Sequence, residues 1–433
     1  MKDRNIILQK LTTIAFTVIL LAGIYIIIEQ LLLKEMVSAL NICFVESILC
    51  LTAYCAWKSH VSYLFLPAAI GSVILLFCTC FLGVTPIDKR YLVQAAAAIT
   101  ALISGTAVWL PKRRVLSLRS VPKGTAAAVL LLTAFSLCFW GINTYLHKQD
   151  MTGAGKNIWA VPSVYDHTPE EQAGTLEKID YQTKAYATDH RTVTKSAYVY
   201  LPFGYDPEKS YNIFYLMHGT GDDESYWLEK NAYNKLMVDR MTADGIIGPM
   251  IIVTPSFYVE DDCAGDLDQL TYSFQDELRN DLMPAVEGTY STYAESCDTD
   301  GFTASRDHRA FAGLSRGAVT TLHSALCGSL DYFSWFGAFS GSRTDGAYLQ
   351  ETIQTDSMKD YPIHCFYTTS GSYDFALSGQ IADYRSMLDT ESRLKEGVNT
   401  TFDVFPMRYH STGSWHLALY NFLPQIFLDS LIN

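Results

Sequence analysis

The sequence predicts an α/β domain that follows an α-helical membrane domain of about five transmembrane helices. Two observations predict this arrangement. Long apolar stretches fill the first third of the 433 residues. From about residue 174 onward, short runs of β-forming residues alternate with helical patterns, which is typical of an α/β fold. The chain therefore divides into a membrane domain at 1–146, a linker rich in glycine, proline and polar residues at 147–173, and an α/β domain at 174–433.

The expected membrane domain rests on five apolar stretches, at 11–28, 36–57, 61–84, 91–110 and 125–146. Each is about as long as the ~20 residues that a helix needs to cross the hydrocarbon core of a bilayer. Because the stretch at 91–110 is rich in alanine and less apolar, four spans are the alternative. The first stretch could instead be a signal peptide, but its apolar run exceeds the usual length of about 7–15 residues and shows no clear cleavage site.

The distribution of lysine and arginine sets the expected orientation, because cytoplasmic segments carry an excess of both. With the N-terminus inside, the cytoplasmic segments hold nine basic residues and the short outer loops hold three. Five spans then place everything after Leu146 outside the cytoplasm. We therefore expect a multi-pass protein of the cell membrane whose α/β domain is extracytoplasmic.

One acidic residue, Glu46, falls in the middle of an expected span. An intramembrane acid is costly and points to a functional site, whereas the simpler interpretation is a protonated side chain that bonds a neighbouring helix. Nothing else in the spans resembles a transport or proton pathway, so we interpret the membrane domain mainly as an anchor.

Charge differs between the two parts of the chain. The whole chain carries −13 at pH 7, but residues 1–149 hold thirteen basic and five acidic side chains, which gives +8 there and −21 for the remainder. Such asymmetry indicates that the two parts face different surroundings. An acidic C-terminal part argues against nucleic acid as a partner, because a polyanion would be repelled.

Six of the ten cysteines fall in the apolar spans. No Cys-x-x-Cys or Cys/His cluster has the spacing of a zinc site, so no metal is expected. Cys327 falls in a helical pattern and Cys365 in a strand pattern, which predicts that both are buried. Cys263 and Cys297 lie in polar loop sequence on either side of one helix, and in an oxidising compartment we expect them to form a disulfide.

Short strands with helices between them make up the α/β domain. Helical periodicity is clear, for example, at 273–286 and 318–327. Runs of β-branched, aromatic and other apolar residues predict strands at 197–201, 213–217, 250–254, 309–313, 363–368 and 401–406.

The motif Gly313-Leu314-Ser315-Arg316-Gly317 indicates the chemistry. It joins the predicted strand 309–313 to the predicted helix 318–327, and a sharp turn between strand and helix is the setting of a nucleophile elbow. Glycine two residues before and two after the serine leaves room for chain that passes closely on both sides. The helix also points its N-terminus at developing negative charge. Ser315 is therefore the predicted nucleophile.

A nucleophilic serine needs hydrogen-bond donors for the oxyanion that forms on its substrate. The segment His218-Gly219-Thr220-Gly221 follows the predicted strand 213–217, which is where such sites take their second donor. We assign the backbone N–H groups of Thr220 and Arg316 to the oxyanion hole. His218 is expected to shape the loop rather than to act as a base.

The acid of the triad is expected after the serine and before the base in the chain. Asp374 comes just after the predicted strand 363–368 and is the predicted acid. Asp345 and Asp356, both in loop sequence, are the alternatives.

Two histidines compete as the base. His410 lies in loop sequence after the predicted strand 401–406, whereas His416 falls in a helical pattern beside its buried stripe. His410 is therefore the predicted base. His323 and His364 fall inside a predicted helix and a predicted strand, where structural roles are expected.

At these residues the region from about 174 to the end resembles the feruloyl esterase and esterase D group, the first carbohydrate esterase family, which has the α/β-hydrolase fold. Antigen 85-type mycolyltransferases share this fold. Relatives often place Trp five residues after the catalytic His and Leu-Tyr nine and ten after it, a spacing that His410 fits. The matching motifs are Val199-Tyr200-Leu201-Pro202, the His218-Gly219 loop, Thr254-Pro255, Glu277-Leu278 before Leu282-Met283-Pro284, Ser305-Arg306-Asp307-His308-Arg309, the elbow, Ser340-Gly341, Gly371 to Asp374, Trp415, and Leu419-Tyr420-Asn421-Phe422-Leu423-Pro424.

The resemblance implies a serine esterase that hydrolyses carboxylic esters on plant-wall polysaccharides without a metal or organic cofactor. Two residues depart from the family pattern, because Thr220 stands where many relatives carry Gly and Arg316 stands where Met is frequent. The leading hypothesis is an extracytoplasmic esterase whose substrate is an acylated carbohydrate or another ester.

Two other functions are weighed against this one. The expected anchor motivates a cell-envelope acyltransferase of the mycolyltransferase kind, in which a sugar or lipid hydroxyl replaces water. A sensor or binding module that has lost catalysis is the third hypothesis, and the complete set of Ser, Asp and His argues against it.

Overall fold

The computed structural model describes residues 2–32, 96, 97, 99, 100, 160–166, 170–259, 266–371, 374–405 and 408–428. The chain divides into two compact units. The first comprises Met1–Leu146, Gly371–Phe375 and Val404–His410, and the second comprises His147–Ser370, Ala376–Asp403 and Ser411–Asn433.

Helix α1 (Lys2–Leu32) contains the first of the expected membrane spans, 11–28. The expected spans at 36–57, 61–84 and 125–146, together with Glu46, lie outside the described residues, and so does most of 91–110. In the part of the chain that the structure describes, no helix is both long enough and apolar enough to cross a bilayer. The expected membrane domain of five helices therefore stays a prediction.

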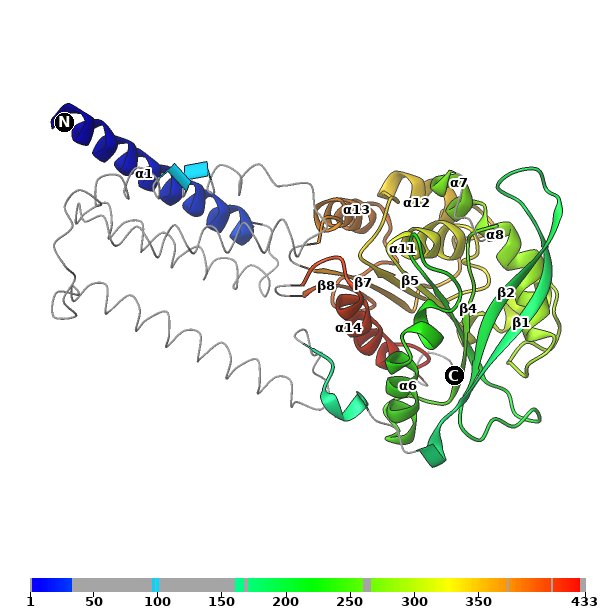
Figure 1. Ribbon diagram of the computed structural model, residues 1–433. Coiled ribbons are helices and arrows are strands. Elements are labelled where there is room, and N and C mark those ends of the chain that lie inside the picture. The colour runs from blue at the N-terminus through cyan, green and yellow to red at the C-terminus, as the bar shows by residue number, and fades with distance from the viewer. Residues whose placement is uncertain are drawn as a thin grey trace. The chain divides into compact units, whose positions relative to one another are not determined.

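An eight-stranded sheet forms the centre of the α/β domain (Figure 1), with the strand order β1-β2-β4-β3-β5-β6-β7-β8. The five strands from β4 to β7 in this order pair in parallel, whereas β1 pairs with β2, and β2 with β4, in antiparallel fashion. The strands are β1 (Thr175–Lys184), β2 (Thr192–Leu201), β3 (Asn212–Met217), β4 (Met250–Thr254), β5 (Arg309–Leu314), β6 (Trp335–Phe339), β7 (Cys365–Gly371) and β8 (Thr400–Phe405).

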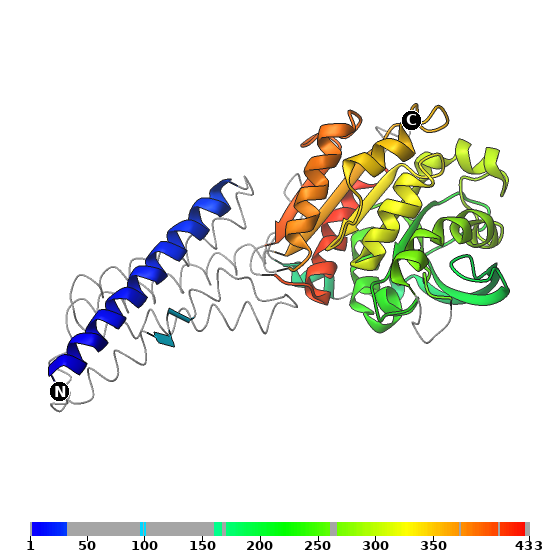
Figure 2. The ribbon, with the colours of Figure 1, turned by 90° about the horizontal axis from the view of Figure 1, so that it is seen from above.

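Helices cover both faces of this sheet (Figures 1 and 2), with α11, α12 and α13 on one face and α6 and α14 on the other. The α-helices are α6 (Tyr233–Ala243), α7 (Leu267–Tyr272), α8 (Phe274–Glu277), α9 (Met283–Glu287), α10 (Thr299–Ala304), α11 (Arg316–Thr320), α12 (Gly346–Ile353), α13 (Leu377–Thr390) and α14 (Thr412–Phe422). The described part of the chain also contains the π-helical segments η5 (Tyr226–Lys230), η6 (Leu278–Leu282) and η8 (Thr321–Cys327), and the 3₁₀ turns η3 (Ser163–Asp166), η4 (Glu170–Gln172), η7 (Arg306–His308) and η9 (Leu423–Gln425).

Neighbouring residues of β3 point into different layers of the core. Tyr215 packs with its ring parallel to that of Phe311, whereas the ring of Phe214 lies 5.6 Å from that of Phe422 on α14. The strands β3, β4, β5 and β6 are almost entirely buried. Burial on both faces explains why these strands are continuous apolar runs in the sequence, as is usual for parallel sheets.

All six predicted strands are present, although β2 and β7 extend beyond the predicted residues. Two strands were not predicted: β1, whose residues are mostly polar and exposed, and β6, which contains Gly337. The predicted helix at 273–286 forms α8, η6 and α9 in succession, and the one at 318–327 forms the greater part of α11 and η8. Parallel pairing brings the carboxyl ends of the central strands to one edge of the sheet, where open α/β sheets hold their ligands.

The prediction of a disulfide between Cys263 and Cys297 was wrong. Cys297 is a free thiol, and Cys263 lies outside the described residues. The chain leaves β4 at Thr254 on the carboxyl edge of the sheet, whereas Cys297 precedes α10 and the start of β5 at the opposite edge. Loop sequence alone does not tell at which edge a cysteine lies. Cys327 and Cys365 are buried, as predicted.

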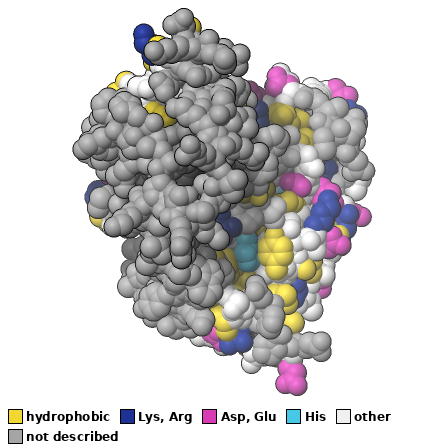
Figure 3. Space-filling view, turned by 60° about the vertical axis from the view of Figure 1, so that its left-hand side comes forward, with side chains coloured by type: hydrophobic (Ala, Val, Ile, Leu, Met, Phe, Trp, Pro, Cys, Tyr) yellow, Lys and Arg dark blue, Asp and Glu magenta, His cyan; other side chains and the backbone are white. Residues whose placement is uncertain are grey.

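Charged side chains of both signs lie next to one another on the described surface that Figure 3 shows. Exposed ion pairs of the α/β domain include Lys230 with Asp223 at 2.6 Å and Arg343 with Asp268 at 2.7 Å. On the face in view, the acidic excess of the domain is therefore interspersed with basic side chains.

Candidate active site

Ser315 lies in the turn between β5 and α11, with φ of 52° and ψ of −112°. A positive φ is uncommon for a residue that has a side chain, and such strain persists where the surrounding structure enforces it, often at functional sites. The N–H of Ser315 donates to the carbonyl oxygen of Phe339 at the end of β6, at 2.8 Å. The turn thus presents a half-buried serine at the carboxyl edge of the sheet.

The glycines around Ser315 have no room for a side chain. A Cβ atom at Gly313 would lie 2.5 Å from the backbone of Gly317, and one at Gly317 would lie 2.4 Å from the carbonyl oxygen of His218. A Cβ atom at Gly219 would lie 3.2 Å from Cβ of Ser315. The segment 218–221, which is the predicted oxyanion loop, therefore packs directly against the elbow.

His218 is fully buried, and both of its ring nitrogens are engaged. Nδ1 lies 2.7 Å from the carbonyl oxygen of Gly219, and Nε2 lies 2.8 Å from Oγ of Ser256. Burial lowers the pKa of His218 to about 4, so the ring is neutral near pH 7. Because a carbonyl oxygen only accepts, the single hydrogen of the neutral ring is on Nδ1, and Ser256 donates to Nε2. His218 therefore holds the loop and has no basic nitrogen available to Ser315.

Of the two predicted oxyanion donors, Arg316 follows the nucleophile in the chain, whereas Thr220 lies in the loop that packs against the elbow. Thr220 is exposed and directly follows Gly219, which lies against Ser315. Arg316 is the first residue of α11, where backbone N–H groups have no partner within the helix. The side chain of Arg316 pairs with Asp268.

Asp374 and His410 form a hydrogen-bonded pair. Nδ1 of His410 lies 3.0 Å from Oδ1 and 3.2 Å from Oδ2 of Asp374. The carboxylate is completely buried, and its backbone N–H donates to the carbonyl oxygen of Gly371 at 3.0 Å. The ring of Phe375 lies 4.3 Å from the imidazole. A Cβ atom at Gly371 would meet the carbonyl oxygen of Arg408 at 2.3 Å, so the two segments that carry the pair are in contact.

The alternative acids have other roles in the structure. Asp345 caps the N-terminus of α12 by accepting the N–H of Tyr348 at 2.9 Å. The side chain of Asp356 is 98% exposed and pairs with Lys359. Neither contact involves a histidine.

Three further histidines that the sequence offered, His416, His323 and His364, make structural contacts. His416 lies on α14, where Nδ1 is 2.6 Å from the side-chain oxygen of Asn234. His323 stacks on Tyr272, with ring centroids 3.8 Å apart, and His364 lies 3.1 Å from Asp307 at the amino edge of the sheet.

The structure thus contains two assemblies of predicted site residues. Ser315 contacts the loop 218–221 within the second unit, and Asp374 pairs with His410 within the first.

The sequence analysis did not predict the residues that hydrogen-bond to the oxyanion loop from the segment after β4. Ser256 bonds His218, and the hydroxyl of Tyr258 accepts the N–H of Gly221 at 3.0 Å. Both residues lie just after β4 and about 40 positions from the loop. The motif Thr254-Pro255 in front of them was the only local signal.

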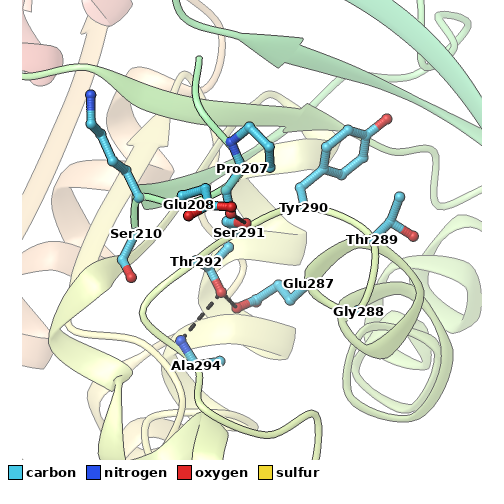
Figure 4. Close-up of a pocket in the computed structure, with 11 residues that line it drawn as sticks. Pro207, Glu208, Ser210, Glu287, Gly288, Thr289, Tyr290, Ser291, Thr292 and Ala294 are labelled. Carbon is cyan, nitrogen blue, oxygen red and sulfur yellow. Dashed lines mark hydrogen bonds between the residues drawn. The ribbon is translucent and has the colours of Figure 1, made fainter.

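A cavity of about 300 Å³ lies at the opposite edge of the sheet, beside the start of β3 (Figure 4). Its lining is formed by the segments 207–210 and 287–292 together with Ala294. Tyr211 and Thr292 form a bridge next to it, which fixes the cavity at the amino ends of the parallel strands. It is therefore separate from the elbow. Among the described residues, no cluster of three or more His, Cys, Asp or Glu could hold a metal ion.

Comparison with known proteins places these features in a family. The model of the esterase family, described as "Putative esterase", matches residues 193–426. The curated relatives include endo-1,4-beta-xylanase Y of Acetivibrio thermocellus, 35% identical over 246 residues, and an endo-1,4-beta-xylanase/feruloyl esterase of Xylanibacter ruminicola, 30% identical over 235 residues. These matches cover 54% and 52% of this chain but only 22% and 28% of the relatives.

A solved structure gives the same result for the fold. A mutant of the feruloyl esterase module from Clostridium thermocellum, complexed with sinapinate, is 31% identical to this chain and superimposes with a TM-score of 0.55. The match covers 63% of this chain and 94% of that module. The described α/β domain therefore has the α/β-hydrolase-like fold of that module.

Proposed function

We propose that this chain, which belongs to the esterase family, is a serine carboxylic-ester hydrolase of the feruloyl esterase-like group with Ser315, His410 and Asp374 as its catalytic triad. The observation that carries this assignment is the elbow: Ser315 has φ of 52° and lies between two glycines that have no space for a Cβ atom. Such a conformation is the one that exposes a nucleophilic serine at the top of the sheet.

The proposed reaction has two steps. Oγ of Ser315 attacks the ester carbonyl while Nε2 of His410 takes the hydroxyl proton, and the proton then passes to the departing alcohol. The acyl group remains on the serine until water attacks it with His410 again as the base. Asp374 orients the imidazole and stabilises its protonated form.

The oxyanion of each tetrahedral intermediate is stabilised by backbone N–H groups, for which we propose Thr220 and Arg316. Preorganised donors of this kind usually supply the largest single contribution to the lowering of the barrier. The packing of Gly219 on Ser315 supports this assignment, because it holds the loop within reach of the attacked carbonyl.

The substrate is proposed to be an acylated carbohydrate, with a feruloyl or acetyl group as the acyl part. Two relatives support this class: one carries the name endo-1,4-beta-xylanase/feruloyl esterase, and the other is a feruloyl esterase module complexed with sinapinate. We also propose that the N-terminal part anchors the enzyme in the cell membrane with the α/β domain outside the cytoplasm. The apolar stretches of 1–146 and the distribution of basic residues support this placement.

The proposal is tested with the purified full chain on acetyl, feruloyl and longer acyl esters of the same sugar. We expect turnover of at least one ester, with free acid as the product. An acyltransferase would instead pass the acyl group to an added sugar acceptor, which product analysis with and without the acceptor detects. Failure of a fluorophosphonate probe to label Ser315 would favour a binding module without catalysis. Protease added to intact cells tests the location, because protection of the α/β domain would contradict it.

A further inference from the structure

A buried network of polar side chains lies behind the oxyanion loop. Nζ of Lys195 on β2 lies 2.6 Å from Oε2 of Glu277 on α8, and both side chains are about 95% buried. The other carboxylate oxygen of Glu277 accepts the hydroxyl of Tyr181 at 2.5 Å. Lys195 also donates to the backbone carbonyl oxygen of Ser256, at 2.7 Å. The ion pair thus holds the chain just after β4 at a fixed point.

Ser256 connects the segment after β4 to the loop 218–221. Its hydroxyl accepts the N–H of Tyr258 at 3.1 Å and donates to Nε2 of His218 at 2.8 Å. The other ring nitrogen of His218 donates to the carbonyl oxygen of Gly219, the residue before Thr220. Hydrogen bonds on either side of Ser256 therefore connect the ion pair, through Ser256 and His218, to the peptide group that carries the proposed oxyanion donor, the N–H of Thr220.

A buried ion pair is weak evidence for stability, because removing two charges from water costs several kcal/mol per ion. Here the lysine bonds a backbone oxygen as well as the carboxylate, and it joins three separate elements of the fold: β2, α8 and the segment after β4. An apolar pair of similar volume would fill the same space but could not hold the carbonyl group of Ser256. The contacts indicate that the pair orients this segment.

We propose that Ser256, held in place by the Lys195–Glu277 ion pair, is a positioning residue for the oxyanion hole of Ser315. It acts through His218 on the peptide plane between Gly219 and Thr220. This inference rests on the proposed function, because it requires the Thr220 N–H to stabilise the oxyanion. Positioning of a donor affects the transition state more than the bound substrate, so its loss lowers kcat and leaves KM nearly unchanged.

The chain offers a matched control at the opposite edge of the sheet. Arg309 and Glu287 form an ion pair at 2.8 Å whose side chains are 99% and 100% buried. Glu287 also accepts the hydroxyls of Tyr215 and Thr292, the second of which is drawn in Figure 4. This pair is as buried as Lys195–Glu277 but has no bonded path to the loop 218–221 among its described contacts.

The first experiment compares Ser256→Ala and Ser256→Thr with wild type in the full chain, on one activated ester. Ser256→Ala is expected to lower kcat about ten- to hundredfold, less than the about 10²–10³-fold that follows the loss of a donor itself. KM stays within about threefold of wild type, because substrate binding is untouched. Ser256→Thr keeps the hydroxyl and restores kcat to within about threefold of wild type.

The second experiment compares Glu277→Gln with the control Glu287→Gln. Both are expected to lower the melting temperature, because each leaves a buried cation without its counter-charge. At a temperature where circular dichroism shows both variants to be folded, only Glu277→Gln lowers kcat. If Ser256→Ala does not fold, this comparison decides the same question.

The positioning role would be overturned if kcat were unchanged in both Ser256→Ala and Glu277→Gln. If Ser315→Ala were inactive in the same assay, the serine mechanism would still stand. Equal losses of kcat in Glu277→Gln and Glu287→Gln would also overturn it, since the effect would then follow from stability alone. Full activity of Ser315→Ala is a distinct result, which would refute the proposed function on which the inference rests.

Discussion

Nδ1 of His410 lies 3.0 Å from Oδ1 of Asp374, whose carboxylate is completely buried. A carboxylate only accepts hydrogen bonds, so the imidazole carries its hydrogen on Nδ1 and keeps the lone pair of Nε2 for the nucleophile. This tautomer is the one that a serine triad requires. The pair thus fixes both the orientation of the base and the position of its proton.

Asp374→Asn is expected to lower kcat by about 10⁴-fold, because an amide stabilises the wrong imidazole tautomer. The change is nearly isosteric, so circular dichroism should show the fold retained. Asp345→Asn is the control, since Asp345 only caps α12 and asparagine caps as well as aspartate. A mild effect of Asp374→Asn together with a severe effect of Asp345→Asn would reassign the acid.

We expect His410→Ala to lower activity and His416→Ala to lower stability. Loss of the base is expected to lower kcat/KM by several orders of magnitude. Loss of His416 removes its hydrogen bond to Asn234 and its packing on Tyr233, which should lower the melting temperature and leave kcat/KM within a few-fold of wild type. Measurement of both parameters for both variants on one activated ester separates the roles. Loss of activity confined to His416→Ala would show that the base has been misassigned.

Gly317→Ala is expected to lower kcat by about 10²-fold or more, because its Cβ atom would lie 2.4 Å from the carbonyl oxygen of His218. The oxyanion loop and the elbow must then separate, and a displacement of about 1 Å at a catalytic group can cost about 10²-fold in rate. Gly379→Ala on α13 is the matched control, since a Cβ atom there meets nothing within 4 Å. It should leave kcat unchanged. Equal activities of the two variants would contradict the packing described for the elbow.

Acid should destabilise the α/β domain through His218. Burial lowers the pKa of His218 to about 4, from about 6.5 for an unperturbed histidine. Between these values the unfolded state binds more protons than the folded state, so the free energy of unfolding falls as the pH falls from about 6.5 to 4. The carbonyl of Gly219 and the charge of Asp223 raise this pKa in part, whereas Lys195 and Lys230 lower it further.

The check is urea unfolding followed by tryptophan fluorescence at several pH values, for wild type and His218→Gln. Because glutamine does not titrate, the urea midpoint of His218→Gln should depend less steeply on pH between about 6.5 and 4 than that of wild type. Identical slopes for the two proteins would show that His218 does not titrate as described.

The predictions of Ser315 and His410 as site residues rest on local pattern. The elbow is a contiguous motif between a strand and a helix, and the loop setting of His410 differs from the helical setting of His416 within a few residues. Asp374 was predicted for the same reason, because it follows β7 directly. Each of these residues is placed by its own neighbours in the sequence.

Contacts between distant segments could not be predicted in this way. Ser256 and Glu277 are 61 and 82 residues from Lys195, and no motif links the three. The expected disulfide failed for a related reason, since the sequence pattern gives no information on the edge of the sheet at which Cys297 lies. Such features depend on strand order, which the sequence pattern did not reveal.

The most direct test of the serine mechanism is mass spectrometry of the acyl-enzyme. The full chain is mixed with an activated acetyl ester, quenched in acid and digested with trypsin, which cleaves after Arg309 and Arg316 and releases the peptide 310–316 with Ser315 as its only serine. We expect the mass of one acetyl group on this peptide, and neither adduct nor turnover above about 10⁻⁴ of wild type in Ser315→Ala. An acyl group on another peptide, or activity of Ser315→Ala within tenfold of wild type, would contradict the account.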